Sequence, residues 1–374
     1  MSRLRDLSGL AVLAAALALS PSLRADDLDL DAEAPPSNLS WSGDLLLRQD
    51  WLRSWPAGDN ESRLLFRLRY GPTWQINDQW TLGSALRVNE SSIGNEHLVD
   101  YNDNQRPRDL ALDTLYLSYA PTDGQLLQAG KDGLPLALSR MLWDPNLRPA
   151  GLFYSDKQAM GDASLRFVAG AFLGQYLSGD QSRIDALQAD LRLAEAGAVH
   201  PEFILSYLHF TDLGNLLQAG EDRGNPFIPV APPPVPVYPG PGFTFLDQYE
   251  LLDLQFALHV DGEVPFRMLL DADKNLGAVA GNDRAGRLEL ALGDGSHGGG
   301  DEVGLAAERM QQSAVLGAFN SDEWWFHAGS HGTMLWYAYG WSDRVRLQAS
   351  WFHEQPDGSW HHWNRVLLDL SWQL

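Results

Sequence analysis

Long runs in which polar and apolar residues alternate recur through most of the chain, and they constrain its fold more than any other feature. In residues 64–74 the even positions are Leu, Phe, Leu, Tyr, Pro and Trp, whereas Arg67, Arg69 and Thr73 stand at odd positions. A period of two is typical of a β-strand whose two faces meet different surroundings. The same split recurs in 39–50, 345–351 and 365–374. The chain is therefore expected to be all β.

The length of these runs separates two classes of β protein. Strands of soluble sandwiches average ~5–6 residues, whereas a tilted strand needs ~9–11 residues to cross a bilayer. The alternating runs here are roughly 10 to 14 residues long, which favours the membrane-spanning class. The sequence thus predicts a transmembrane antiparallel β-barrel.

The pattern predicts about sixteen strands, with fourteen or eighteen as alternatives because 125–133, 151–158 and 285–293 are weak. The expected ranges are 39–52, 62–75, 80–92, 109–120, 125–133, 151–158, 163–173, 183–194, 200–211, 247–260, 265–275, 285–293, 301–313, 332–340, 344–354 and 361–374. Sixteen strands form an even-numbered barrel with an aqueous lumen and with both of its ends on one side.

The connections between these strands alternate in length. Brief turns at 76–79, 121–124, 261–264 and 341–343 contrast with long segments at 93–108, 134–150, 212–246 and 314–331. Short periplasmic turns and long extracellular loops are typical of bacterial outer-membrane barrels. Aromatic residues that would form a girdle at the membrane interface flank the short turns or lie on the apolar face of the last strand: Trp74, Trp80, Tyr119, Trp341 and Trp372.

The N-terminal segment is predicted to direct export. Arg3 and Arg5 precede an apolar run at 10–19 that is too short to span a bilayer, and Ala25 ends a plausible cleavage sequence. We therefore expect a signal peptide at 1–25, an acidic lead-in at 26–37 and the barrel at 38–374.

Composition excludes several functions. The chain has no cysteine, which rules out disulfides and thiolate chemistry, and its formal charge of −22 argues against nucleic acid as a partner. No Ser–His–Asp pattern stands out, and histidines in the last loops are read as solvated, so no enzyme activity, metal or cofactor is expected. A barrel with an adhesive, structural or hydrolytic role is the alternative to a conducting pore.

Charged residues suggest how the lumen is lined. Alternation places Arg63, Arg67, Arg69, Arg87 and Arg365 on the inward face, and it gives Asp271 and Asp273 a shared lumen face rather than a calcium site. Acidic residues nevertheless outnumber basic ones in several loops, so a weak preference for cations at low salt is expected.

The segment 134–150 is too apolar for an exposed loop, because its Leu, Met and Trp residues would form a large patch in water. Folding against the inner wall would remove that exposure. It would place Arg140, Asp144 and Arg148 in the channel, with Asp144 facing the wall arginines, so that opposed charges form a constriction. By contrast, the Pro-rich run at 226–241 cannot pair as a strand, and no role is assigned to it.

Four segments support a family resemblance. They are Gly130-Lys131, the Trp-Asp-Pro segment at 142–151, Ala314–Asp322 and the terminal strand at 364–370. Together they resemble a family of proteobacterial porins, although Asp132-Gly133-Leu134-Pro135 and the final Leu374 depart from its pattern. The resemblance implies passive diffusion of small hydrophilic solutes or ions through the outer membrane of a Gram-negative bacterium, with the pore narrowed by the third loop. Outer-membrane lipid is then a partner, and a homotrimer remains open.

Overall fold

The structure is a computed structural model. It describes residues 38–55, 60–91, 109–174, 182–194, 197–216, 224–229, 243–279 and 281–374. The expected signal peptide at 1–25 and the acidic lead-in at 26–37 lie outside the described residues. Residues Asn38 to Leu374 form one compact unit, which contains the strands.

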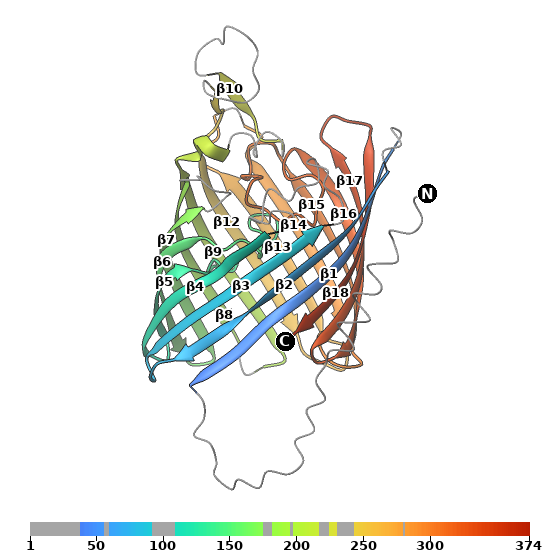
Figure 1. The fold of residues 1–374 in the computed structure, drawn as a ribbon. Helices are drawn as coiled ribbons and strands as arrows, with labels where there is room; N and C mark the ends of the chain where they lie inside the picture. The colour runs from blue at the N-terminus through green and yellow to red at the C-terminus, as the bar shows by residue number, and fades with distance from the viewer. Residues whose placement is uncertain are drawn as a thin grey trace. The chain divides into compact units, whose positions relative to one another are not determined.

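Sixteen antiparallel strands close into one barrel, which confirms the fold class and the strand number expected from the sequence (Figure 1). The strands are β1 (Leu39–Trp55), β2 (Asn60–Gln75), β3 (Trp80–Ser91), β4 (Asp109–Thr122), β5 (Gln125–Lys131), β6 (Ala150–Met160), β7 (Ala163–Gly174), β8 (Ser182–Leu193), β9 (Val199–Thr211), β12 (Tyr249–Val260), β13 (Phe266–Asn275), β14 (Arg284–Gly293), β15 (Asp301–Met310), β16 (Ser330–Ser342), β17 (Val345–Pro356) and β18 (His362–Gln373). The three weakly patterned segments are β5, β6 and β14, so the counts of fourteen and eighteen are set aside.

Each strand pairs with its neighbours in sequence, and β18 pairs with β1 to close the ring. β9 pairs directly with β12, because β10 and β11 are not strands of the barrel. The segment between them contains a short 3₁₀ helix, η2 (Leu213–Leu216), and a separate two-stranded sheet of β10 (Phe227–Pro229) and β11 (Phe243–Phe245). β10 lies at the start of the Pro-rich run 226–241, so the expectation that this run cannot pair as a strand is wrong for 227–229, and 230–241 lie outside the described residues.

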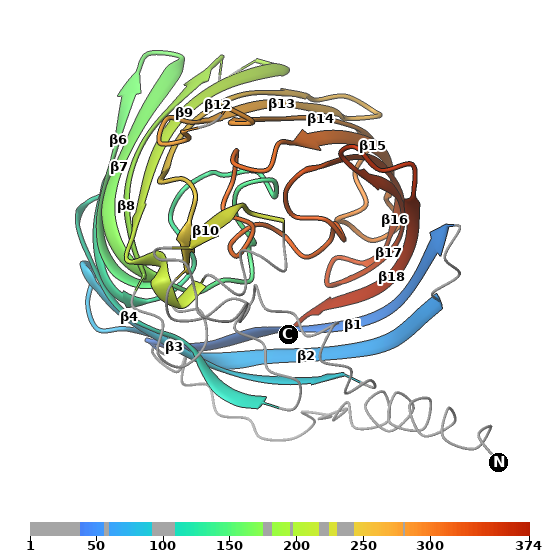
Figure 2. The ribbon, with the colours of Figure 1, turned by 90° about the horizontal axis from the view of Figure 1, so that it is seen from above.

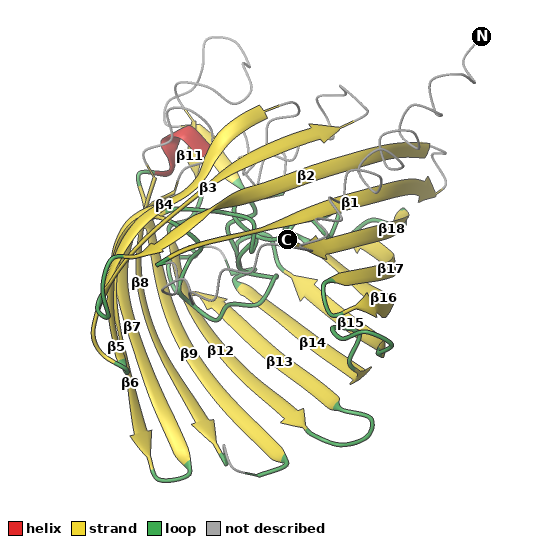
Figure 3. Ribbon diagram, turned by 60° about the horizontal axis from the view of Figure 1, so that its bottom comes forward, coloured by secondary structure: helices red, strands yellow, loops and turns green. Residues whose placement is uncertain are grey.

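Short turns join the strands at one end of the barrel, which we call the short-turn end. They include 76–79, 123–124, 161–162, 261–265 and 343–344. The longer connections lie at the opposite, long-loop end. Both ends of the barrel chain meet at the short-turn end, where the Leu374 N–H donates to the Gly43 carbonyl at 2.9 Å. Figure 3 shows how completely strands make up this unit.

Alternation along each strand separates an outward apolar face from an inward polar face. In β8, Leu187 points outward and is 57% exposed, whereas its neighbours along the inward face include the buried Gln188 and Asp190. In β12, Leu254 is likewise exposed and Gln255 is buried. In a soluble protein the apolar side chains would point inward. Their outward position here suits a barrel that is surrounded by lipid. No helix in the described part of the chain is long and apolar enough to cross a membrane.

Candidate functional site

Residues 132–149, between β5 and β6, leave the barrel wall and lie inside the lumen; we call them the first inner loop. Figure 2 shows two loop segments within the ring of strands. Backbone groups of Ala137 bind the inward side chain of Gln188 in β8, with N–O distances of 2.9 and 3.1 Å. The Ala137 carbonyl also accepts from Gln255 in β12, and the Pro135 carbonyl accepts from Arg166 in β7. Side chains of three strands therefore hold the loop against the inner wall.

The apolar side chains of this loop are what draw it inward. Met141, Leu142, Trp143 and Leu147 are each at most 6% exposed. They join an apolar cluster with inward residues of the wall: Phe153, Val168, Phe172, Ile184, Leu208 and Phe210. Burial of each large apolar side chain contributes about 1.5–3 kcal/mol, which makes the inserted position favourable for a loop of this composition.

A second loop, residues 311–329 between β15 and β16, also lies inside the barrel; we call it the second inner loop. Its apolar residues Ala314, Val315, Leu316, Ala318 and Phe319 are buried in the same cluster. It contacts the first inner loop directly. This position was not predicted from the sequence, although the apolar residues of 314–319 give the same signal as those of 134–150.

The two inner loops are joined by backbone and ring contacts. The Asp144 N–H donates to the Phe319 carbonyl at 2.7 Å, and the Ser321 N–H donates to the Arg140 carbonyl at 3.0 Å. The rings of Trp143 and Phe319 stack with centroids 5.4 Å apart. The loops thus form one layer that narrows the lumen from within.

Asp144 interacts electrostatically with Arg140, Arg67 and Arg48, and its direct hydrogen-bond donors are backbone groups of the two inner loops. The residue is 1% exposed, and its carboxylate accepts from the N–H groups of Asn146 at 2.7 Å and Asp322 at 3.3 Å. Burial raises the pKa of Asp144 above its ordinary value, although the Asn146 hydrogen bond opposes this effect. Asn146 accepts a hydrogen bond from Arg67. Asp144 therefore shapes its own loop and links it to the second.

The wall arginines expected from the sequence do lie on the inward faces of β2 and β3. Arg69 donates to Asp44 at 2.7 Å, and Arg67 also lies 3.2 Å from this carboxylate. Arg63 donates to Asp50 at 2.9 Å. Each of these arginines is thus matched by a carboxylate of the neighbouring strand β1.

Arg87 and Arg148 meet at one carboxylate, that of Asp113 in β4. Arg87 in β3 lies 3.5 Å from it, and Arg148 of the first inner loop lies 3.6 Å from it. Arg148 also donates to the carbonyl of Pro145 at 2.6 Å. Arg148 therefore ties the end of the loop to the wall.

Among the charged side chains of the first inner loop, that of Arg140 reaches the open part of the lumen. Its side chain is 44% exposed and pairs with Glu323 of the second inner loop. Glu323 in turn lies 3.7 Å from Arg48 of β1, whose guanidinium binds Asp369 of β18 through two hydrogen bonds. Charges from two loops and the closing seam of the barrel are thus brought together.

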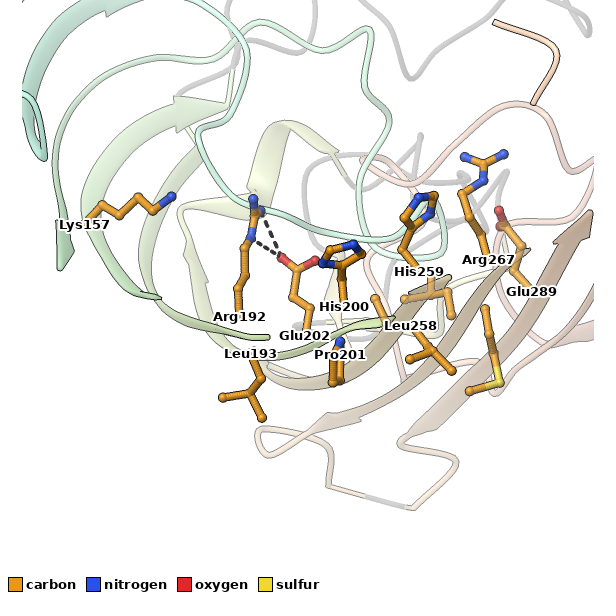
Figure 4. Close-up of a pocket in the computed structure, with 13 residues that line it drawn as sticks. Lys157, Arg192, Leu193, His200, Pro201, Glu202, Leu258, His259, Arg267 and Glu289 are labelled. Atoms are coloured by element: carbon orange, nitrogen blue, oxygen red, sulfur yellow. Dashed lines mark hydrogen bonds and ion pairs between the residues drawn. The ribbon is translucent and has the colours of Figure 1, made fainter. Parts of the chain in front are cut away.

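A cavity of about 680 Å³ lies toward the short-turn end, and we call it the vestibule. Figure 4 shows its charged side chains pointing into one space, whereas Leu193, Pro201 and Leu258 point the other way. The charged and titratable lining residues are Lys157, Arg192, His200, Glu202, His259, Arg267 and Glu289. These residues were not predicted as a site, although they alternate with outward apolar residues in the sequence.

The aromatic residues expected at a membrane interface lie near the short turns. Trp74 and Trp341 are 47% and 70% exposed. Trp80 and Tyr119 are cross-strand partners whose rings stack at 4.6 Å, and Trp372 is opposite Leu45 near the end of β18. All five lie near the short-turn end, where the sequence pattern placed them.

The protein is similar to known proteins in its structure and not in its sequence. No protein-family model matches the sequence, and no curated protein matches it. OprB of Pseudomonas putida, solved at high pH, matches with a TM-score of 0.58 and 11% identity over 90% of this chain and 94% of that one. OmpF of Salmonella typhi, in complex with daunomycin, matches with a TM-score of 0.55 and 10% identity over 90% and 97%.

An anion-selective porin from Comamonas acidovorans is similar in the same way. Its TM-score is 0.54, with 10% identity over 90% of this chain and 99% of that one. Such low identities show a shared fold and leave the solute open. The fold of this chain is that of the porin barrels.

Proposed function

We propose that the protein is a passive diffusion channel for small hydrophilic solutes or ions in the outer membrane of a Gram-negative bacterium. One observation carries the proposal: a closed sixteen-stranded barrel is narrowed from within by two loops, and Arg140 remains 44% exposed at that level. Barrels of this strand number enclose an aqueous channel rather than a packed interior. Charged groups at a narrowing select solutes by size and charge.

The orientation follows from the two ends of the barrel. Short turns with flanking aromatic residues suit the periplasmic interface, and the long loops suit the extracellular side. The apolar outward face would contact outer-membrane lipid. A homotrimer remains an expectation, which cross-linking of the protein in native membranes would measure.

Recording from single channels in a planar lipid bilayer tests the proposal. Purified protein should give stepwise conductance, and Arg140→Gln should change the ratio of potassium to chloride permeability by about fivefold. Two unit charges ~4 Å apart in water interact by ~1 kcal/mol, and an energy of this size changes a permeability ratio about fivefold. Arg309→Gln is the control, because Arg309 lies on the outward face of β15. Protein that inserts without conductance steps would refute the channel.

A further inference from the structure

The vestibule brings two histidines from different strands onto one carboxylate. His200 in β9 and His259 in β12 are direct cross-strand partners, and their rings stack with centroids 5.9 Å apart. Both Nε2 atoms contact Asp261 in the adjoining turn, at 2.9 Å from one carboxylate oxygen and 2.8 Å from the other. The two rings are 28% and 43% exposed, so water and ions reach them.

The permanent charges around this pair are largely matched. On one side Arg192 of β8 binds Glu202 of β9 at 3.0 Å and the buried Asp190 at 3.2 Å. On the other side Arg267 of β13 binds the buried Glu302 at 2.6 Å.

Two further charged residues complete the lining. Glu289 of β14 binds the buried Arg287 at 2.7 Å, and Lys157 of β6 lines the far side of the vestibule. Arg192 and Arg267 therefore already have carboxylate partners, so the two histidines are the lining groups that can add positive charge to the vestibule.

Protonation of the two histidines changes this balance. Histidine is the side chain that ordinarily gains charge between about pH 8 and pH 5. The hydrogen bond from His200 and, to a smaller extent, that from His259 hold the pKa of Asp261 below its usual range. This carboxylate therefore stays ionised as the medium becomes acidic. One carboxylate offsets only one of two imidazolium charges. Acidification therefore adds positive charge to the vestibule beside Arg192 and Arg267.

We propose that the vestibule is a binding site for small divalent anions, such as sulfate or a dicarboxylate, which forms when His200 and His259 are protonated. The two imidazolium groups of β9 and β12 then lie between Arg192 of β8 and Arg267 of β13, and because these arginines are already paired with carboxylates, the histidines supply the added positive charge. A volume of about 680 Å³ lies within the range of small-molecule sites. This site rests on the proposed channel function and sets the ion preference of its short-turn end.

Ion selectivity as a function of pH tests the site. In a KCl gradient, the ratio of chloride to potassium permeability should rise by about fivefold between pH 8 and pH 5, and sulfate should reduce the chloride current at pH 5 only. Sulfate is a suitable probe because it remains divalent over this range. The double variant His200→Gln/His259→Gln should lose both effects. His297→Gln is the matched control, since His297 binds Asp294 in an exposed turn at the same end and does not line the vestibule.

Two outcomes would overturn the site: a permeability ratio that does not change with pH in the unaltered protein, or an equal change in the double variant. Calorimetric titration of sulfate into detergent-solubilised protein separates this inference from the channel proposal. Binding at pH 5 that disappears in the double variant supports the site whether or not the protein conducts. Absence of binding at pH 5 by protein that conducts refutes the site and leaves the channel intact.

Discussion

Arg365 in β18 binds the carboxylate of Asp50 in β1 through two hydrogen bonds, of 3.1 Å from Nε and 2.9 Å from Nη2. Arg63 in β2 binds the same carboxylate at 2.9 Å. Because β1 and β18 are the first and last strands, Asp50 links three adjacent strands across the line where the barrel closes. The three side chains are at most 7% exposed.

Replacement of Asp50 by Asn should weaken the closure of the barrel. Removal of one partner from a buried ion pair costs about 3–5 kcal/mol, because a charge remains buried near groups that no longer balance it. Unfolding in urea, followed by the shift of the folded barrel in cold gel electrophoresis, measures the loss.

Asp185→Asn provides the comparison, since Asp185 pairs with Arg183 and both side chains are exposed. Water and salt screen such an exposed pair, so its loss should change the stability of the barrel very little. Equal losses for the two variants would contradict the role assigned to Asp50.

Asp144→Ala should loosen the contact between the two inner loops. The partly buried N–H groups of Asn146 and Asp322 would lose their acceptor, at a cost below the ~1–3 kcal/mol of a fully buried unsatisfied donor. We expect larger or more variable conductance steps with little change in ion preference. Arg140→Gln should show the opposite pattern, because it changes charge: it removes the pair with Glu323 but leaves in place the backbone hydrogen bonds that join the two loops. A change in ion preference as large as that of Arg140→Gln would contradict this account.

Trp143→Ala should release the first inner loop from the apolar cluster. A buried Trp replaced by Ala costs about 3–5 kcal/mol, and the stack on Phe319 adds to the loss. The barrel wall itself should persist, because its strands pair independently of this side chain. Trypsin should therefore cleave more rapidly after Arg140, as read by mass spectrometry of the folded protein. Leu187→Ala, on the outward face of β8, should leave the cleavage rate unchanged.

At neutral pH and low salt the channel should prefer cations weakly. The formal charge of −22 attracts cations toward the mouths of the barrel, and the screening length falls from ~30 Å at 0.01 M to ~3 Å at 1 M salt. The preference should therefore decline as KCl concentration rises. Reversal potentials in KCl gradients at two mean concentrations measure it. Chloride preference at pH 8 and low salt would overturn the prediction.

The strands could be predicted from the sequence because alternation is a local property. Arg67 and Arg69 stand on one parity and Leu68 and Tyr70 on the other, so their faces follow once lipid and water take opposite sides. The apolar residues of 134–150 likewise indicated an inserted loop, since their exposure to water would be unfavourable. Short turns and long loops followed from turn-forming residues between the strands.

Only the tertiary structure decided which groups meet across the lumen. Alternation predicts which side chains face inward, but it does not predict which groups lie opposite them. Those contacts depend on how the barrel closes and on how the inner loops pack. For this reason the sequence did not indicate that Asn146 accepts from Arg67, that Arg140 pairs with Glu323 of a distant loop, or that the pairing of β9 with β12 brings His200 to His259. The sequence by itself determined the wall of the barrel, and long-range packing determined the chemistry of its interior.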